Sequence, residues 1–127
     1  MVCLDSSTII DFLRGHGPSV KLIGSYEARN EVLTTTVVSV YELLRSPSKR
    51  SREEAEAFLS KLFIYPLTEA AARRSAEMCL ALKSKGVTID DPDIMVASIA
   101  ASNGELLVAS DKDFENTGYD RLKIIEK

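Results

Sequence analysis

Histidine is scarce in this chain of 127 residues, in which His16 is the only one. A lone histidine excludes acid–base catalysis by a histidine pair, and His16 stands in a His-Gly-Pro turn where we expect it to face solvent. There are only two cysteines, Cys3 and Cys79, both in apolar segments and without zinc-ligand spacing. We expect two buried thiols, no disulfide framework and no zinc site.

Glycine-rich catalytic motifs are also missing. The sequence contains no Gly-x-x-x-x-Gly-Lys-Ser/Thr phosphate loop, no Gly-x-Gly-x-x-Gly and no Gly-x-Ser-x-Gly elbow. These absences argue against nucleotide hydrolysis and acyl transfer.

The chain lacks a basic excess and a long apolar run. A net charge of −3 and a pI near 5.2 argue against a protein that coats nucleic acid non-specifically. With no signal-peptide pattern and no run long enough to span a bilayer, we expect a cytoplasmic protein without membrane contact. The length and a hydrophobic content of 45% predict one domain over residues 1–127.

Apolar strand patterns alternate with helical ones along the whole chain. Strands are predicted at residues 2–4, 32–38, 64–67, 106–109 and 122–125. Helices are predicted at residues 9–14, 18–29, 39–44, 51–63, 68–85 and from 91 to near 104. This alternation predicts an α/β fold with a parallel sheet covered on both faces.

Four acidic residues stand where predicted strands give way to helices or loops: Asp5, Glu42, Asp93 and Asp111. Because the carboxyl ends of parallel strands meet at one edge, we expect these side chains to share a single cleft. Four carboxylates held together repel one another unless some are protonated or a cation lies between them. Oxygen-only ligands favour Mg²⁺ or Mn²⁺.

Each of these acids also has a purely structural interpretation. Asp5 could cap the first helix, although Ser6 and Ser7 beside it could cap it equally well. Ser39 and Glu42 have the spacing of a capping box. Around Pro92 we expect Asp91 to be the helix cap, which leaves Asp93 in the first turn facing the strand ends.

The segment from Ser110 to Phe114, which contains Asp111 and Asp113, could be an ordinary polar turn. The shared location of the acids, rather than any one of them, indicates a metal site.

Several segments together resemble the PIN domain, and specifically VapC-type toxins of prokaryotic toxin–antitoxin pairs. They are Leu4-Asp5-Ser6-Ser7 with Ile9-Ile10-Asp11, then Glu42-Leu43, Ile89 to Ala97, and Leu107 to Phe114. Each motif is short, but all occur in order and span nearly the full chain. Where many members have Thr-Asn this chain has Ser6-Ser7, and Ala109 replaces a frequent Thr or Ser.

The resemblance implies a three-layer α/β sandwich with a mostly parallel sheet of about five strands. It also implies an Mg²⁺- or Mn²⁺-dependent ribonuclease that leaves a 5′-phosphate and a 3′-hydroxyl. Asp5, Glu42, Asp93 and Asp111 match its catalytic, metal-binding quartet, and Asp91 and Asp113 match auxiliary acids. Ser7 and Ser110 would orient the metal ligands through hydrogen bonds.

The resemblance implies three partners: an RNA substrate, a cognate antitoxin that inserts a basic side chain into the acidic cleft, and a second copy of the chain. We expect dimerisation through the apolar residues Ala72, Ala76, Met78, Leu80 and Leu82. Five basic residues could hold the RNA backbone, unless they are ordinary surface charges: Arg14, Arg45, Lys49, Arg50 and Arg52.

Other functions compete with this one. A phosphate-receiver domain shows an adjacent acidic pair after its first strand, whereas Asp5 is followed by Ser6. A haloacid-dehalogenase-like phosphatase needs an aspartate at the position of Ser7. A PIN-like module that only binds RNA or protein is not separated from an enzyme by sequence.

Overall fold

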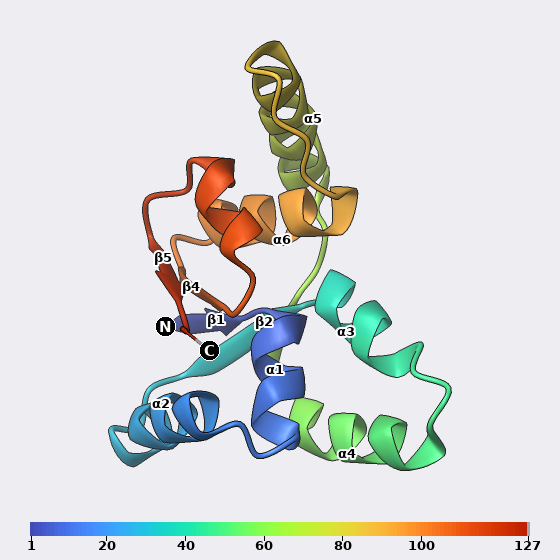
Figure 1. Cartoon of the computed structure of the whole chain (residues 1–127), viewed down its shortest axis with the longest axis vertical. Coiled ribbons are helices and arrows are strands. Elements are labelled where there is room, and N and C mark those ends of the chain that lie inside the picture. Colours follow the sequence, from blue (N-terminus) through green and yellow to red (C-terminus); the bar gives the residue numbers. More distant parts are fainter. Residues whose placement is uncertain (127) are drawn as a thin grey trace.

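A single parallel sheet of five strands organises residues 1–126, the part of the chain that the computed structural model describes (Figure 1). The strand order is β3-β2-β1-β4-β5, and every neighbouring pair is parallel. The strands are β1 (Val2–Leu4), β2 (Leu33–Thr36), β3 (Phe63–Tyr65), β4 (Leu106–Ala109) and β5 (Leu122–Ile124). From β1 the chain builds outward first to β2 and β3, then crosses to β4 and β5, so the direction of winding reverses between β1 and β4.

Helices cover both faces of the sheet, which confirms the predicted three-layer sandwich. One face carries α1 (Ser6–Leu13), α2 (Gly17–Ala28) and α4 (Lys49–Leu59), and the other carries α6 (Asp91–Ser102) and the 3-10 helix η1 (Lys112–Thr117) (Figure 1). Helix α3 (Val37–Leu44) lies at one side, and α5 (Glu69–Ser84) packs on α6 and projects away from the sheet (Figure 1).

The central strand β1 shows how the sequence builds these layers. Val2 and Leu4 pack into the core under α1, α2 and α4, whereas Cys3 between them packs against α6. Successive side chains of a strand point to opposite faces, so a fully apolar strand needs a helical layer on each side. Burial in this core raises the pKa of the Cys3 thiol to about 12, and the thiol is therefore an inert apolar group, as predicted.

The capping residues of three helices differ from those predicted. Helix α3 begins two residues before Ser39, because the Thr36 side chain accepts a hydrogen bond from the Ser39 amide and ends the strand earlier than predicted. Helix α4 is capped by Ser48 rather than starting at Ser51, and it ends at Leu59. The capping residue of α6 is Asp90 rather than Asp91.

The apolar surface expected for α5 is divided between two environments. Leu82 is buried in a core cluster with Ile89 and Ile94, so it is unavailable to a second copy of the chain. Leu80, in contrast, is 68% exposed. Cys79 is only half-buried, so the expectation of a fully buried thiol is wrong for this residue.

Residues 1–126 contain no helix that is both long and apolar enough to cross a membrane.

Candidate metal centre

Asp5 lies at the point where the sheet reverses its winding. It directly follows β1, and its backbone amide donates a hydrogen bond to the carbonyl of Val108 in β4. The carboxylate caps α1 through Oδ2, which accepts from the amide of Ser7 at 3.2 Å and from its hydroxyl at 2.7 Å. The capping role considered from sequence is therefore real, but it occupies only one of the two oxygens.

The second oxygen, Asp5 Oδ1, is buried and has no hydrogen-bond partner within residues 1–126. The residue is only 2% exposed, and this burial raises the pKa of Asp5 to about 6. The hydrogen bonds from Ser7 oppose this rise in the pKa, and the charge of Glu42 adds to it. A buried carboxylate oxygen without a donor costs free energy unless a cation or proton satisfies it.

Glu42 reaches the same edge of the sheet from α3. Its Oε1 accepts a hydrogen bond of 3.0 Å from the Ser6 hydroxyl, and its Oε2 lies 3.9 Å from the Arg45 guanidinium. The alternative interpretation of Glu42 as part of a capping box with Ser39 is wrong, because Thr36 caps this helix and Ser39 is already inside it. The glutamate is thus held by a residue adjacent to Asp5 instead of by its own helix.

Asp93 completes the cluster from the first turn of α6. Burial is the largest influence on its carboxyl group, and the charges of Asp5, Asp111 and Glu42 add to it, so that the pKa of Asp93 rises to about 7. Three carboxylates contributed by β1, α3 and the end of β4 therefore act on Asp93 together. The charges of the four acids therefore interact with one another at this edge of the sheet.

Asp111 is exposed and caps η1 by accepting a hydrogen bond of 2.9 Å from the Asp113 amide. The two auxiliary acids, Asp91 and Asp113, are also exposed, and neither contributes to the raised pKa of Asp93. Asp90 does contribute, although sequence reasoning did not place it in the site. Its position beside the amino end of α6 is the signal that could have identified it.

Ser7 links the two central strands behind the carboxylates. While its hydroxyl donates to Asp5, the same oxygen accepts a hydrogen bond of 3.2 Å from the backbone amide of Ser110. Thr8 adds a hydrogen bond of 3.1 Å to the Val108 carbonyl. The Ser110 hydroxyl itself is buried and has no hydrogen-bond partner among the described residues. Ser7 therefore hydrogen-bonds to Asp5 directly, whereas Ser110 contributes its backbone amide and not its hydroxyl.

The donor set fits a hard divalent cation. The site offers carboxylate and hydroxyl oxygens, one buried oxygen without a partner, and a shared negative charge that a cation would neutralise. Within residues 1–126, no three acidic, histidine or cysteine side chains are close enough together as they stand to hold one ion. Binding would therefore draw the carboxylates together; Asp5 is buried, Glu42 and Asp93 are half-buried, and Asp111 is exposed.

The basic residues proposed from sequence divide by environment. Arg45 and Arg50 lie beside acidic side chains of α3 and α4, and Lys49 pairs at the surface with Glu53 at 3.8 Å. Arg52 donates to the backbone carbonyl of Ser46 at 2.7 Å, which gives it a structural role. The only histidine, His16, is half-buried and contacts the Ser19 hydroxyl at 3.2 Å, so the expectation of a solvent-facing ring is only partly met.

Carboxylates at the switch point of a parallel α/β sheet are oxygen ligands of the kind that divalent cations prefer. The model of the PIN domain matches residues 2–119, and the chain therefore belongs to the PIN domain family. No curated protein sequence matches the chain.

Three solved structures show the likeness in detail. A chain of VapBC2 from Rickettsia felis, bound to a promoter DNA fragment, is 21% identical, with 99% of this chain and 100% of that chain covered and a TM-score of 0.86. VapBC-5 from Mycobacterium tuberculosis is 26% identical over 99% of this chain and 98% of that chain, with a TM-score of 0.69. VapC20 from the same organism is described as a toxin that cleaves the sarcin–ricin loop. It is 17% identical, with 97% of this chain and 99% of that chain covered and a TM-score of 0.73.

Proposed function

We propose that the chain is a metal-dependent endoribonuclease that hydrolyses RNA phosphodiester bonds and acts as the toxin of a toxin–antitoxin pair. The observation that carries this proposal is that the charges of Asp5, Glu42 and Asp111 all act on Asp93, while the buried Oδ1 of Asp5 has no hydrogen-bond partner among residues 1–126. Membership of the PIN family and the toxins among the similar structures support it.

Asp5, Glu42, Asp93 and Asp111 would hold Mg²⁺ or Mn²⁺. Such a cation, when bound, supplies Lewis-acid activation of water and neutralises charge on the scissile phosphate. The chain contributes the positioning: Ser7 fixes the rotamer of Asp5, and Ser6 fixes that of Glu42. Asp91 and Asp113 stay auxiliary candidates, since both are exposed at the rim. Hydrolysis would leave a 5′-phosphate and a 3′-hydroxyl.

A cognate antitoxin is the expected protein partner. VapBC2 of Rickettsia felis and VapBC of Salmonella typhimurium were both solved as toxin–antitoxin pairs on DNA, and their toxin fold matches this chain. An acidic cleft attracts basic side chains, so an antitoxin arginine or lysine that reaches Asp93 would compete with the metal. Homodimerisation and a cytoplasmic location are further parts of the proposal.

Cleavage of RNA by the purified protein tests this function. The protein is incubated with single-stranded RNAs of varied sequence in Mg²⁺, in Mn²⁺ and in excess EDTA, and the ends of the products are analysed. We expect cleavage only with metal and products that carry 5′-phosphates. Cleavage undiminished in EDTA would contradict the metal mechanism, whereas no cleavage under any condition would favour a PIN module that only binds RNA or protein.

A further inference from the structure

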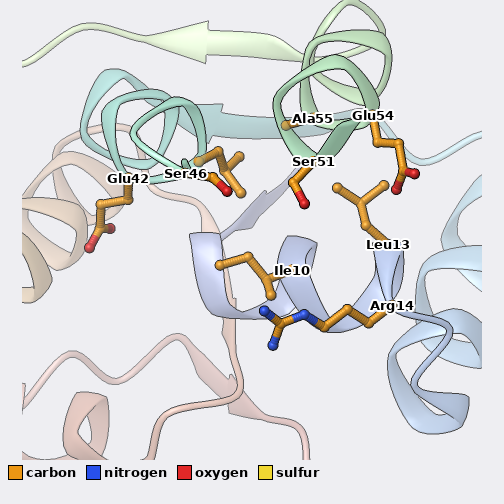
Figure 2. A pocket seen from close by; sticks show the side chains of 9 residues that line it. Ile10, Leu13, Arg14, Glu42, Ser46, Ser51, Glu54 and Ala55 are labelled. Atoms are coloured by element: carbon orange, nitrogen blue, oxygen red, sulfur yellow. The ribbon is translucent and has the colours of Figure 1, made fainter. Parts of the chain in front are cut away.

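A small pocket adjoins the carboxylate cluster, between α1, α3 and α4 (Figure 2). Its volume is about 170 Å³. A cavity of roughly 150 Å³ accommodates one benzene ring, while sites for drug-sized ligands begin at about 300 Å³. The pocket therefore has the size of a single ring system.

The walls of the pocket combine apolar and hydroxyl groups. Ile10, Leu13 and Ala55 supply apolar surface. Ser46, in the connection between α3 and α4, and Ser51 of α4 supply hydroxyl groups (Figure 2). An apolar wall with a few hydrogen-bonding groups suits a flat heteroaromatic ring, which has apolar faces and a polar edge.

One residue belongs to both the pocket and the acidic cluster. Glu42 forms one end of the pocket, and its charge contributes to the raised pKa of Asp93. A group bound in the pocket would therefore lie next to the place where the four carboxylates would position a scissile phosphate.

One basic residue lines the pocket. Arg14 is exposed, and within residues 1–126 its guanidinium makes no hydrogen bond or ion pair. The two acids of the lining each have an arginine beside them: Arg45 lies 3.9 Å from Glu42, and Arg50 lies 2.9 Å from Glu54. Among the described residues, Arg14 is therefore the charged side chain of the lining that no opposite charge pairs with. A guanidinium without a partner suits the acceptor atoms of an RNA base or phosphate and disfavours a second basic side chain.

We propose that this pocket binds the base of a nucleotide next to the scissile phosphate, with Arg14 hydrogen-bonding to the edge of the base. The pocket would then set the base preference of cleavage. Guanine is the expected occupant, because its O6 and N7 accept a bidentate pair of hydrogen bonds from an arginine. This inference rests on the proposed function as a ribonuclease.

Two substitutions test the pocket without altering the four acids. Arg14→Gln removes the donor pair, and Ser51→Phe places a ring in the pocket from an exposed position on α4. Arg29→Gln is the matched control, since Arg29 is the exposed capping residue at the end of α2 just as Arg14 is at the end of α1.

Cleavage is measured on a pool of single-stranded RNAs with randomised bases around the cut site. We expect the parent and Arg29→Gln to prefer guanine at one position beside the cut. In both pocket variants the ratio of the cleavage rate with guanine to the rate with the other bases should fall roughly tenfold. The cleavage rate with the other bases should change much less. Pocket variants that retain the parental preference would overturn the proposal while leaving the nuclease function intact.

Binding provides a second readout that does not need cleavage. Labelled RNA pentamers that differ only in the central base are titrated into Asp93→Asn protein with Mg²⁺ present, with and without Arg14→Gln. We expect the pentamer with central guanine to bind tightest and to lose this advantage in the double variant. Equal affinity for all four pentamers would overturn the subsite even if the parent cleaves no RNA. Weaker binding of a coexpressed antitoxin to Ser51→Phe, with an unchanged RNA preference, would assign the pocket to the antitoxin instead.

Discussion

The hydroxyl of Ser7 donates a 2.7 Å hydrogen bond to Oδ2 of Asp5. The two residues are separated only by Ser6 in the turn from β1 into α1, yet the same hydroxyl oxygen accepts from the Ser110 amide at the end of β4. This contact joins the two strands at the point where the sheet changes its winding direction. It also leaves Asp5 Oδ1 as the oxygen that remains for a ligand.

Ser7→Ala should lower the metal affinity and the activity of the site without unfolding the protein. The substitution removes the hydroxyl that fixes Asp5 and leaves the Ser110 amide without its acceptor, which costs about 1 kcal/mol of stability. Loss of a group that orients a metal ligand typically lowers metal affinity or activity roughly tenfold or more. Ser25→Ala, which removes an exposed hydroxyl bonded to its own helix, is the control and should leave both unchanged. Metal titration followed by RNA cleavage would measure the effect, and full activity of Ser7→Ala would show that Asp5 needs no support.

The repulsion among the acids should make the metal-free protein less stable as the pH rises. Folding raises the pKa of Asp5 to about 6 and that of Asp93 to about 7, from ordinary values of 3.8. The folded state therefore holds these protons more tightly than the unfolded state, so stability falls as the pH increases from about 4 to about 7.

In EDTA, we expect the parent to unfold at a higher temperature at pH 5 than at pH 8. Asp93→Asn removes one charge from the cluster, so it should reduce this difference and leave the variant as stable as the parent or more stable at pH 8. Asp120→Asn makes the same chemical change at an exposed position and should retain the parental pH dependence. An unfolded Asp93→Asn protein would mean that Asp93 has a structural role.

Dimerisation should depend on the exposed strip of α5. Ala72, Ala76 and Leu80 are spaced four residues apart on this helix and are all exposed. We expect Leu80→Glu to shift a parental dimer to monomer at tens of micromolar protein, as measured by light scattering. Lys83→Glu, an exposed change on the same helix, tests whether charge alone has this effect. A parent that is monomeric under these conditions would rule out the dimer.

An inhibitory partner should bind more weakly as salt increases. Screening reduces attraction between exposed charges, although a buried pair of arginine and carboxylate resists it. We expect Asp93→Asn and Asp111→Asn to lower the affinity of the coexpressed cognate partner as well as the activity, with Asp120→Asn as the control. Partner affinity that is unchanged in both variants would place the inhibitor away from the acidic cluster.

The sequence predicts the parallel sheet well, because the alternation of strands and helices is a local pattern. An apolar strand followed directly by Asp5, and another that ends shortly before Asp111, places these acids at one edge of any parallel sheet. Helix caps were harder to predict. Thr36 and Ser39 are three residues apart and both can cap, so the start of α3 depends on which hydroxyl the packed sheet leaves available.

Contacts between distant segments could not be predicted. The hydrogen bond from Ser6 to Glu42 spans 36 residues and depends on how α1 and α3 cross. The pocket between α1, α3 and α4 depends in the same way on helix packing rather than on any motif. Apolar residues on α5 were similarly ambiguous, since Leu80 and Leu82 look alike in sequence but only Leu82 is buried.

The most direct test of a catalytic metal centre is the rate of RNA cleavage as a function of Mn²⁺ concentration for the parent and for Asp93→Asn, with the unfolding temperature recorded on the same samples. We expect the parent to gain both activity and thermal stability as Mn²⁺ is added, because a ligand that binds only the folded state stabilises it. Asp93→Asn should remain folded, show a much smaller gain in stability and lose at least about a hundredfold in rate. Equal cleavage by the two proteins, or cleavage without any dependence on Mn²⁺, would contradict the proposed role of the four carboxylates.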